Sequence, residues 1–426
     1  MFVPVALPLI FAVCNLADVF SSGSVAWKES AVDFVVERAG DGFAFASEKR
    51  DVAVCMKRGA VSWKGFEVWE ARVYFGDEGV RRVEMSLYNR GDDNDPDGLG
   101  DNALKDLVER VSKAVDPKIK PGRTEQTELK SGGSQYERKW AKTDPNVELA
   151  WGVSKGGPKE RKADFVRVTL SPKSSKPKGA TKSVSGQAAA AKVKSNVSKN
   201  SDGDVWIGNV PMVDQGQKGY CAAACVERVL RYYGHDIDEH EIAQMAGTSA
   251  RGGTMISDMV ETVKTVGSKC RLGFQSVVSM SASMDDLEKE IEMYNKAAKS
   301  EKERELRLGE FMRGNTVLVG EIYAAMKPKV IKKMRVKDAR FKKFLTGVKT
   351  QIDKGIPLFW GVTLGIFPEP GLPQTIGGHI RLIVGYNQKT KEILYTDSWG
   401  AGHELKRMPE DWAFAITHDA FFLKPL

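Results

Sequence analysis

A segment in the middle of the chain, residues 171–204, constrains the fold more than any other feature. Ser, Lys, Ala and Gly dominate it, and no acidic residue occurs in it before Asp202. Such a composition cannot bury enough apolar surface to offset the entropy that ordering costs. We therefore expect a flexible linker that divides the 426 residues into two folded domains.

Residues 1–26 form a candidate signal peptide. Residues 3–13 are nearly all apolar, and small residues follow at 21–26. The apolar run is too short to span a bilayer, and no later segment reaches that length. The usual basic start is missing, since no Lys or Arg precedes Lys28. The sequence thus predicts a secreted or periplasmic protein without an integral membrane segment. The alternative is a buried strand or helix of the first domain.

Residues 27–170 have the pattern of a small α+β domain of unknown role. Apolar residues alternate with polar ones over 69–75 and again over 83–87, which predicts a hairpin. A helix with one apolar face should begin near Asp101 and run to Val115. The segment contains no histidine and no catalytic cluster.

The sequence pattern of residues 205–426 predicts a second α+β domain, in which the helices come first and the strands last. Cys221–Tyr233 should be a helix, and residues 254–266 another that ends at Gly267. After Gly355, four apolar runs are typical of strands. These runs are residues 357–363, 379–386, 392–397 and 413–422.

Cys221 stands where a catalytic cysteine is best activated. A thiol in the first turn of a helix feels the positive end of the helix dipole, which lowers its pKa and favours the nucleophilic thiolate. Gln215, six residues earlier, can return its amide to the sulfur and form an oxyanion site with the backbone N–H of Cys221. Gln217 is the alternative donor, but its spacing fits less well.

A general base and its orienting group can be found on two later strands. His379 begins one apolar run and Asp397 ends the next. If a three-residue turn joined these strands, Tyr386 would pair with Thr390, and His379 would lie opposite Asp397. Directly opposed residues share a face, with Cβ atoms about 5 Å apart. The pattern therefore predicts a Cys221–His379–Asp397 triad.

These motifs resemble those of papain-like cysteine peptidases. The Gln-Gly-x-x-Gly-x-Cys segment at a helix start, then Gly-His, Val-Gly-Tyr and Asp-Ser-Trp-Gly, are most similar to the bacterial double-glycine-leader (bacteriocin-processing) type. The resemblance covers residues 205–426. It implies a Cys221 nucleophile, a His379 base, Asp397 as orienter and Gln215 as oxyanion donor, with Trp399 shielding the His–Asp pair from water.

The sequence also departs from papain. Lys218 and Ala222 replace a cysteine and an aromatic residue beside the nucleophile, and Asp397 stands where papain has asparagine. The separation of Cys221 from His379 slightly exceeds the usual range. No ATP-binding or membrane segment follows, so a complete leader-processing exporter is not expected.

The other cysteines and histidines have structural explanations. Core packing suits Cys225, with Cys270 as a less favoured disulfide partner, and no cysteine spacing resembles a zinc site. His235 and His240 lack further metal ligands, and His403 should be a surface residue. We expect no cofactor and no metal. A net charge of +8 is mild and gives no reason to expect nucleic acid as a partner.

The expected activity is hydrolysis of peptide bonds in a peptide or protein substrate, through an acyl-enzyme. The alternatives are a transglutaminase-like or cell-wall amidase acyl transfer on the same triad, and a catalytically silent binding module. Neither the cleavage specificity nor the oligomeric state follows from the sequence.

Overall fold

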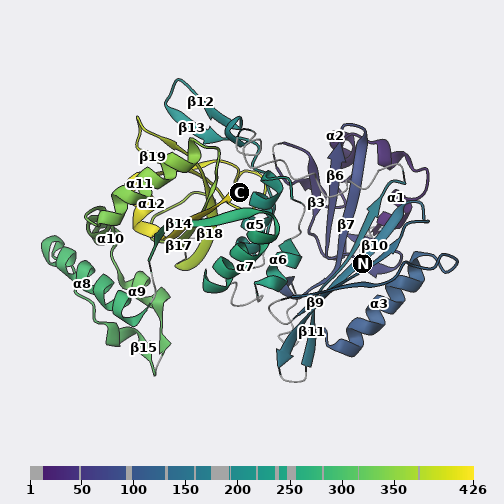
Figure 1. Cartoon of the computed structure of the whole chain (residues 1–426), viewed down its shortest axis with the longest axis horizontal. Helices are drawn as coiled ribbons and strands as arrows, with labels where there is room; N and C mark the ends of the chain where they lie inside the picture. The colour runs from purple at the N-terminus through teal and green to yellow at the C-terminus, as the bar shows by residue number, and fades with distance from the viewer. Residues whose placement is uncertain are drawn as a thin grey trace, which may run out of the picture. The chain divides into compact units, whose positions relative to one another are not determined.

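The computed structural model describes two compact units, residues 1–178 and 179–426 (Figure 1). Both units combine helices with antiparallel strands, so the mixed α+β architecture predicted from the sequence is confirmed. The ranges that the structure describes are 13–47, 49–92, 98–129, 133–157, 160–173, 191, 193–216, 219–235, 239–246, 256–280, 283–314, 316–372 and 375–426.

An antiparallel sheet dominates the N-terminal unit. Its strand order is β2 (Ala44–Phe45), β3 (Val52–Cys55), β6 (Glu70–Gly76), β7 (Gly79–Asn89), β11 (Glu160–Ser171), β10 (Asn146–Gly157), β9 (Ser134–Trp140) and β8 (Glu125–Glu128). The predicted hairpin is present as β6 and β7, and the predicted helix is α3 (Asp101–Val115). Together with α2 (Ala31–Arg38), α3 covers the apolar face of the sheet.

The segment predicted as a signal peptide, residues 1–26, overlaps the folded part of the unit after residue 13. Strand β1 (Cys14–Asn15) pairs with β4 (Val61–Trp63), which also pairs with β5 (Phe66–Glu67). Helix α1 (Leu16–Val19) and the 3-10 helix η1 (Val25–Lys28) follow. Leu16, Phe20 and Ala26 are buried in the core of the unit. Removal of residues 1–26 would therefore delete core residues. Residues 1–12 lie outside the described ranges.

A second antiparallel sheet forms the frame of the C-terminal unit. Its order is β12 (Val197–Lys199), β13 (Asp204–Ile207), β18 (Gly377–Asn387), β17 (Leu358–Leu364), β21 (Thr417–Pro425) and β14 (Leu272–Ser279), and β19 (Glu392–Thr396) pairs with both β18 and β20 (Lys406–Pro409). The end of the predicted linker was wrong, because β12, β13 and the buried Val193 belong to this unit. Residues 174–190, the centre of that linker, are not described.

Helices pack on both faces of this sheet. Residues of α5 (Cys221–Tyr232), α6 (Glu239–Met245) and α7 (Ile256–Lys269) form one apolar cluster with alternate residues of β18, namely Ile380, Leu382 and Val384. The other cluster joins the sheet to α8 (Met284–Glu301), α9 (Val319–Ala325), α10 (Pro328–Val336), α11 (Ala339–Ile352) and α12 (Glu410–Ile416). Figure 1 shows α8, α9 and the hairpin of β15 (Met312–Arg313) and β16 (Thr316–Val317) projecting away from the strands.

Two element boundaries differ from the predictions. Helix α7 continues through Gly267 to Lys269. The glycine allows a close approach of the helix to the sheet, because a Cβ at position 267 would lie 2.8 Å from Leu423 Cδ2. The apolar run at 413–422 begins as helix α12 and becomes strand β21 only at Thr417. Within the described ranges, no helix combines the length and the apolar character needed to cross a bilayer.

Candidate active site

Cys221 is the first residue of α5 and is partly exposed, whereas the residues that follow it in the helix are buried. A tight turn precedes the helix: Gly216 has a φ of 63°, and its N–H donates to Asp214 Oδ1 at 2.9 Å. Asp214 in turn lies against Gly400, where a Cβ would stand 2.4 Å from Asp214 Oδ2. The loop before the cysteine therefore packs against the segment that follows Asp397.

His379 connects the cysteine with the aspartate. Its ring is buried near the start of β18, and its Nε2 lies 2.7 Å from Asp397 Oδ1. The Cys221 side chain is hydrogen-bonded to the same ring. Because Nε2 faces Asp397, the nitrogen that faces the sulfur is Nδ1. The structure thus brings together the three residues that the sequence placed in one triad.

Trp399 covers the His379 ring. The two rings are parallel within 2°, with centroids 4.4 Å apart. His403, predicted as a surface residue, is half-buried and touches the same tryptophan edge-on at 5.9 Å. The indole limits access of water to the His–Asp hydrogen bond, which strengthens that bond electrostatically.

The ionisation of the site favours a thiolate–imidazolium pair. Burial alone would raise the pKa of Cys221, but the hydrogen bond and charge of His379, with backbone hydrogen bonds from Ile380 and Ala222, lower it below its usual value. Burial likewise disfavours the charged His379, yet Asp397 and Cys221 together raise the pKa of His379 to about 9. At neutral pH the ring is therefore positive, and its charge favours the thiolate form of the sulfur.

Asp397 remains ionised although it is fully buried. Burial raises its pKa, but the nearby positive charge of Arg381, the hydrogen bond from His379 and the charge of His379 outweigh that effect and bring the pKa to about 2. The carboxylate can therefore hold the Nε2–H of His379 throughout the physiological range.

Gln215, the predicted oxyanion donor, is buried, and its backbone N–H donates to Ser398 O at 2.8 Å. It is thereby fixed beside the residue that follows Asp397. The alternative donor, Gln217, lies outside the described residues. Participation of Gln215 in an oxyanion site stays a prediction.

The pairing of β18 with β19 differs from the predicted register. Tyr386 pairs with Ile393 rather than with Thr390, because the turn is longer than three residues. A bulge near Gly385 shifts the pairing again. The assumption that placed His379 directly opposite Asp397 was therefore wrong.

The two residues nevertheless share a face. One further step beyond the last pair, Leu382 with Thr396, would place Asp397 opposite Arg381. His379 is then the diagonal neighbour of Asp397, and side chains of this length reach across that spacing. The observed hydrogen bond is a diagonal contact, which explains why it survives the change of register.

Two buried arginines complete the site and were missed from the sequence. Arg228 lies on α5 and donates from Nη1 to Asp397 O and from Nε to Pro211 O, both at 2.8 Å. Arg381 lies on β18, with Nη1 3.4 Å from Asp397 Oδ2. For Arg381 the available signal was a single arginine inside an otherwise apolar stretch, since such a residue is almost never buried without partners.

The remaining cysteines are not catalytic candidates. All five are free thiols, and burial raises the pKa of Cys225 to about 12. Burial also raises the pKa of the half-exposed Cys270. His240 packs edge-on against Tyr220. Within the described ranges, His, Cys, Asp and Glu residues nowhere gather in groups of three or more that could hold a metal ion.

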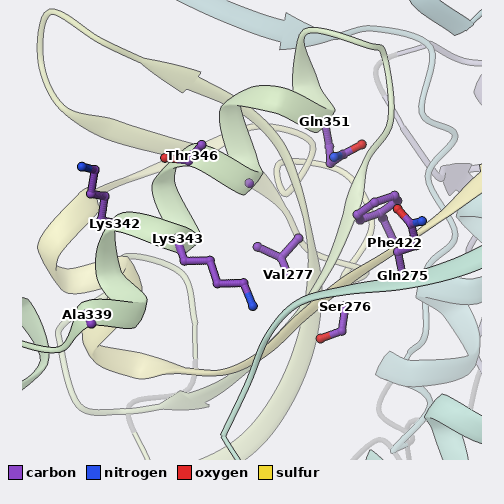
Figure 2. A pocket seen from close by; sticks show the side chains of 10 residues that line it. Gln275, Ser276, Val277, Ala339, Lys342, Lys343, Thr346, Gln351 and Phe422 are labelled. Carbon is purple, nitrogen blue, oxygen red and sulfur yellow. The ribbon is translucent and has the colours of Figure 1, made fainter.

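An open groove of about 540 Å³ lies between α11 and β14 (Figure 2). Its floor is Val277, which touches the helix at Gly347. Lys342 and Lys343 lie on the helix side. The lining contains neither the nucleophile nor its partners, so the groove is separate from the candidate active site.

Two family models match adjoining parts of the C-terminal unit. The Peptidase C39 family matches residues 209–293, and the Peptidase_C39 like family matches residues 283–418. The first match contains Cys221, and the second contains His379 and Asp397. The resemblance inferred from the motifs is therefore confirmed, and the matched region is that of a cysteine peptidase.

Solved structures with some similarity include two peptidases. The peptidase domain of Streptococcus ComA, a bifunctional ABC transporter involved in a quorum sensing pathway, has 11% identity and a TM-score of 0.26, over 51% of this chain and 100% of that one. Xylellain, a cysteine protease from Xylella fastidiosa, has 14% identity and a TM-score of 0.27, over 55% and 89%. No curated protein shows significant sequence similarity to the chain.

Proposed function

We propose that the C-terminal unit hydrolyses peptide bonds with Cys221 as nucleophile, His379 as general acid and base, and Asp397 as the orienting group. One observation carries the proposal: an unbroken hydrogen-bonded series from the Cys221 sulfur through His379 to the Asp397 carboxylate, beneath Trp399. A series of this kind is the arrangement that nucleophilic catalysis by a thiol requires.

The geometry assigns a role to each proton. The Cys221 thiolate attacks the scissile carbonyl carbon, and the carbonyl oxygen becomes an oxyanion. His379 gives its Nδ1 proton to the departing amine, and an acyl-enzyme thioester remains. The now neutral ring takes a proton from water, which attacks the thioester and releases the acid. Throughout, Asp397 keeps the second proton of the ring on Nε2.

The oxyanion forms beside the start of α5. Its donors in this proposal are the Cys221 backbone N–H and the side-chain amide of Gln215. The buried position of Gln215 and its tether to Ser398 support the assignment, because a fixed donor stabilises developing charge without reorganising.

Alkylation by iodoacetamide tests the nucleophile without knowledge of the substrate. At neutral pH Cys221 should react much faster than Cys270, which is similarly exposed but has a raised pKa. His379→Ala should slow the reaction of Cys221, and Gln215→Ala should not.

Cys221→Ala should abolish peptide hydrolysis and leave the melting temperature nearly unchanged, while Cys270→Ala should keep activity. Equal rates for the two thiols, or hydrolysis by Cys221→Ala, would remove the assignment.

Transfer to an amine acceptor is the main alternative outcome. Product analysis in the presence of a primary amine separates the two, because a hydrolase yields the acid and a transferase yields the amide. A silent binding module is disfavoured by the lowered pKa of Cys221.

Export of the protein stays a prediction. If the apolar N-terminal segment directs export, we propose cleavage before Cys14, and the pairing of that residue with Val61 supports this position. N-terminal sequencing of protein recovered outside the producing cells would test this.

A further inference from the structure

Four buried side chains contact Arg381 beside the triad. The residue has no exposed surface, and its guanidinium packs against the rings of Trp360 and Tyr395, at 4.6 and 4.1 Å from their centroids. Its Nη1 and Nη2 donate to the two oxygens of Glu369 at 2.7 and 3.1 Å. Its Nη1 also lies 3.4 Å from Asp397 Oδ2. The guanidinium thus has one place and one orientation.

The strand explains why this arginine reaches the triad. Arg381 lies two residues after His379 on β18, so both side chains leave the same face of the strand. Asp397 presents Oδ1 to His379 and Oδ2 to Arg381. Glu369 comes from the connection between β17 and β18, and its carboxylate also accepts a hydrogen bond from Tyr395.

The result is a series of buried charges of alternating sign. Charges of alternating sign run from Glu369 through Arg381 and Asp397 to His379, each group in contact with the next. The positive ring of His379 in turn favours the thiolate form of Cys221. A lone buried carboxylate would instead take up a proton. The positive charge of Arg381 is in turn balanced by Glu369, so the imidazolium faces little net repulsion.

We propose that Arg381 and Glu369 are positioning residues that act through Asp397, holding its carboxylate directed at His379 and setting, by their opposite charges, the proton affinity of the ring. The inference rests on the proposed function, because it assigns a role to the pair only if the triad is catalytic. The two residues have opposite effects: the arginine favours a deprotonated ring, and the glutamate favours a protonated one.

Other charged groups near the ring have different partners. Lys406, on β20, donates to Pro370 O at 3.1 Å, and Arg228, on α5, donates to the main-chain oxygen of Asp397. The His403 ring contacts Trp399 edge-on, and its main-chain oxygen accepts a hydrogen bond from the backbone N–H of Asp397 at 3.0 Å. Arg381 is therefore the cation that touches the Asp397 carboxylate from outside the triad, among the described residues.

Titration of the full chain by NMR tests the proposal directly. The sequence has five histidines, so the ring signals of histidine-labelled protein can be assigned with a His379→Gln variant. Arg381→Met should raise the pKa of His379 by about one unit, a tenfold change in the ionisation constant, because the ring no longer feels the positive guanidinium while its own charge keeps Asp397 ionised. Glu369→Gln should lower it by a similar amount, because the arginine charge is no longer balanced. Arg381→Lys should restore most of the wild-type value.

A comparable ion pair elsewhere in the sheet provides the control. Arg407→Met breaks the contact of Arg407 with Asp204, at 2.7 Å, and should leave the pKa of His379 unchanged. The inference is overturned if the pKa of His379 is unchanged in both Arg381→Met and Glu369→Gln, or if the two variants shift it in the same direction. If Arg381→Met does not fold, the pKa of His379 in Glu369→Gln and in Arg381→Lys still decides the question. Failure of the proposed function appears separately, as slow alkylation of Cys221 in the wild-type chain.

Discussion

At the scale of single residues, the site is defined by mutual dependence of charges. The lowered pKa of Cys221 and the raised pKa of His379 describe one ion pair, since each group stabilises the charged form of the other. Asp397 is the third member, ionised down to about pH 2. The pH range in which the pair exists should therefore also be the range of activity.

This dependence predicts a bell-shaped pH profile for peptide hydrolysis. Activity should rise with pH as Cys221 ionises, below the usual thiol value, and fall as His379 loses its proton near pH 9. Asp397→Asn should move the alkaline limb to lower pH, because the ring loses its anionic partner. The pH dependence of kcat/KM on an unfolded protein substrate measures both limbs. An alkaline limb that stays in place in Asp397→Asn would contradict the assignment of Asp397.

At the scale of elements, the site depends on how α5 is joined to the end of β19. Arg228, nearly two turns after Cys221, donates through its three nitrogens to Pro211 O, Asp397 O and Thr396 Oγ1. One side chain thus fixes the helix that carries the nucleophile to the segment that carries the aspartate.

Removal of that link should loosen the site. Arg228→Met leaves buried acceptors without their donor, which we expect to lower the free energy of unfolding by about 2 kcal/mol. It should also slow alkylation of Cys221, because the helix start is no longer fixed relative to His379. Urea denaturation and the alkylation rate measure the two effects. Arg340→Met, which breaks a local pair with Asp338 on α11, is the control and should change neither.

The sequence identified the residues of the candidate site better than their geometry. Cys221 at a helix start and His379 on an apolar strand follow from local patterns, and both are present. The register of β18 with β19 was wrong because turn length and bulges are not encoded in alternation. Gly267 was taken as a helix end, although its role is a close approach to Leu423. The partners of Arg228 and Arg381 are distant in sequence, so only the fold reveals them.

At the scale of the whole molecule, the boundary of the C-terminal unit lies earlier than composition indicated. Val193 is buried, and its carbonyl oxygen would lie 2.1 Å from a Cβ at Gly355, a residue with a φ of 76°. Tyr232, the last residue of α5, donates its hydroxyl to Gly355 O at 2.8 Å. The residues around Val193 therefore contribute to the packing of the helix that carries Cys221.

Truncation experiments can locate this boundary. A fragment of residues 191–426 should fold and carry a rapidly alkylated Cys221, because it keeps β12 and the contacts of Val193 with the C-terminal unit. A fragment of residues 205–426 lacks them and should melt several degrees lower, since about 1 kcal/mol corresponds to 2–4 °C in a unit of this size. Thermal unfolding and Cys221 alkylation of both fragments and the full chain make the comparison. Equal melting temperatures for the two fragments would show that β12 is dispensable.

Faster alkylation of Cys221 in the 191–426 fragment than in the full chain would reveal inhibition by the N-terminal unit, whereas equal rates would leave that unit a role other than inhibition.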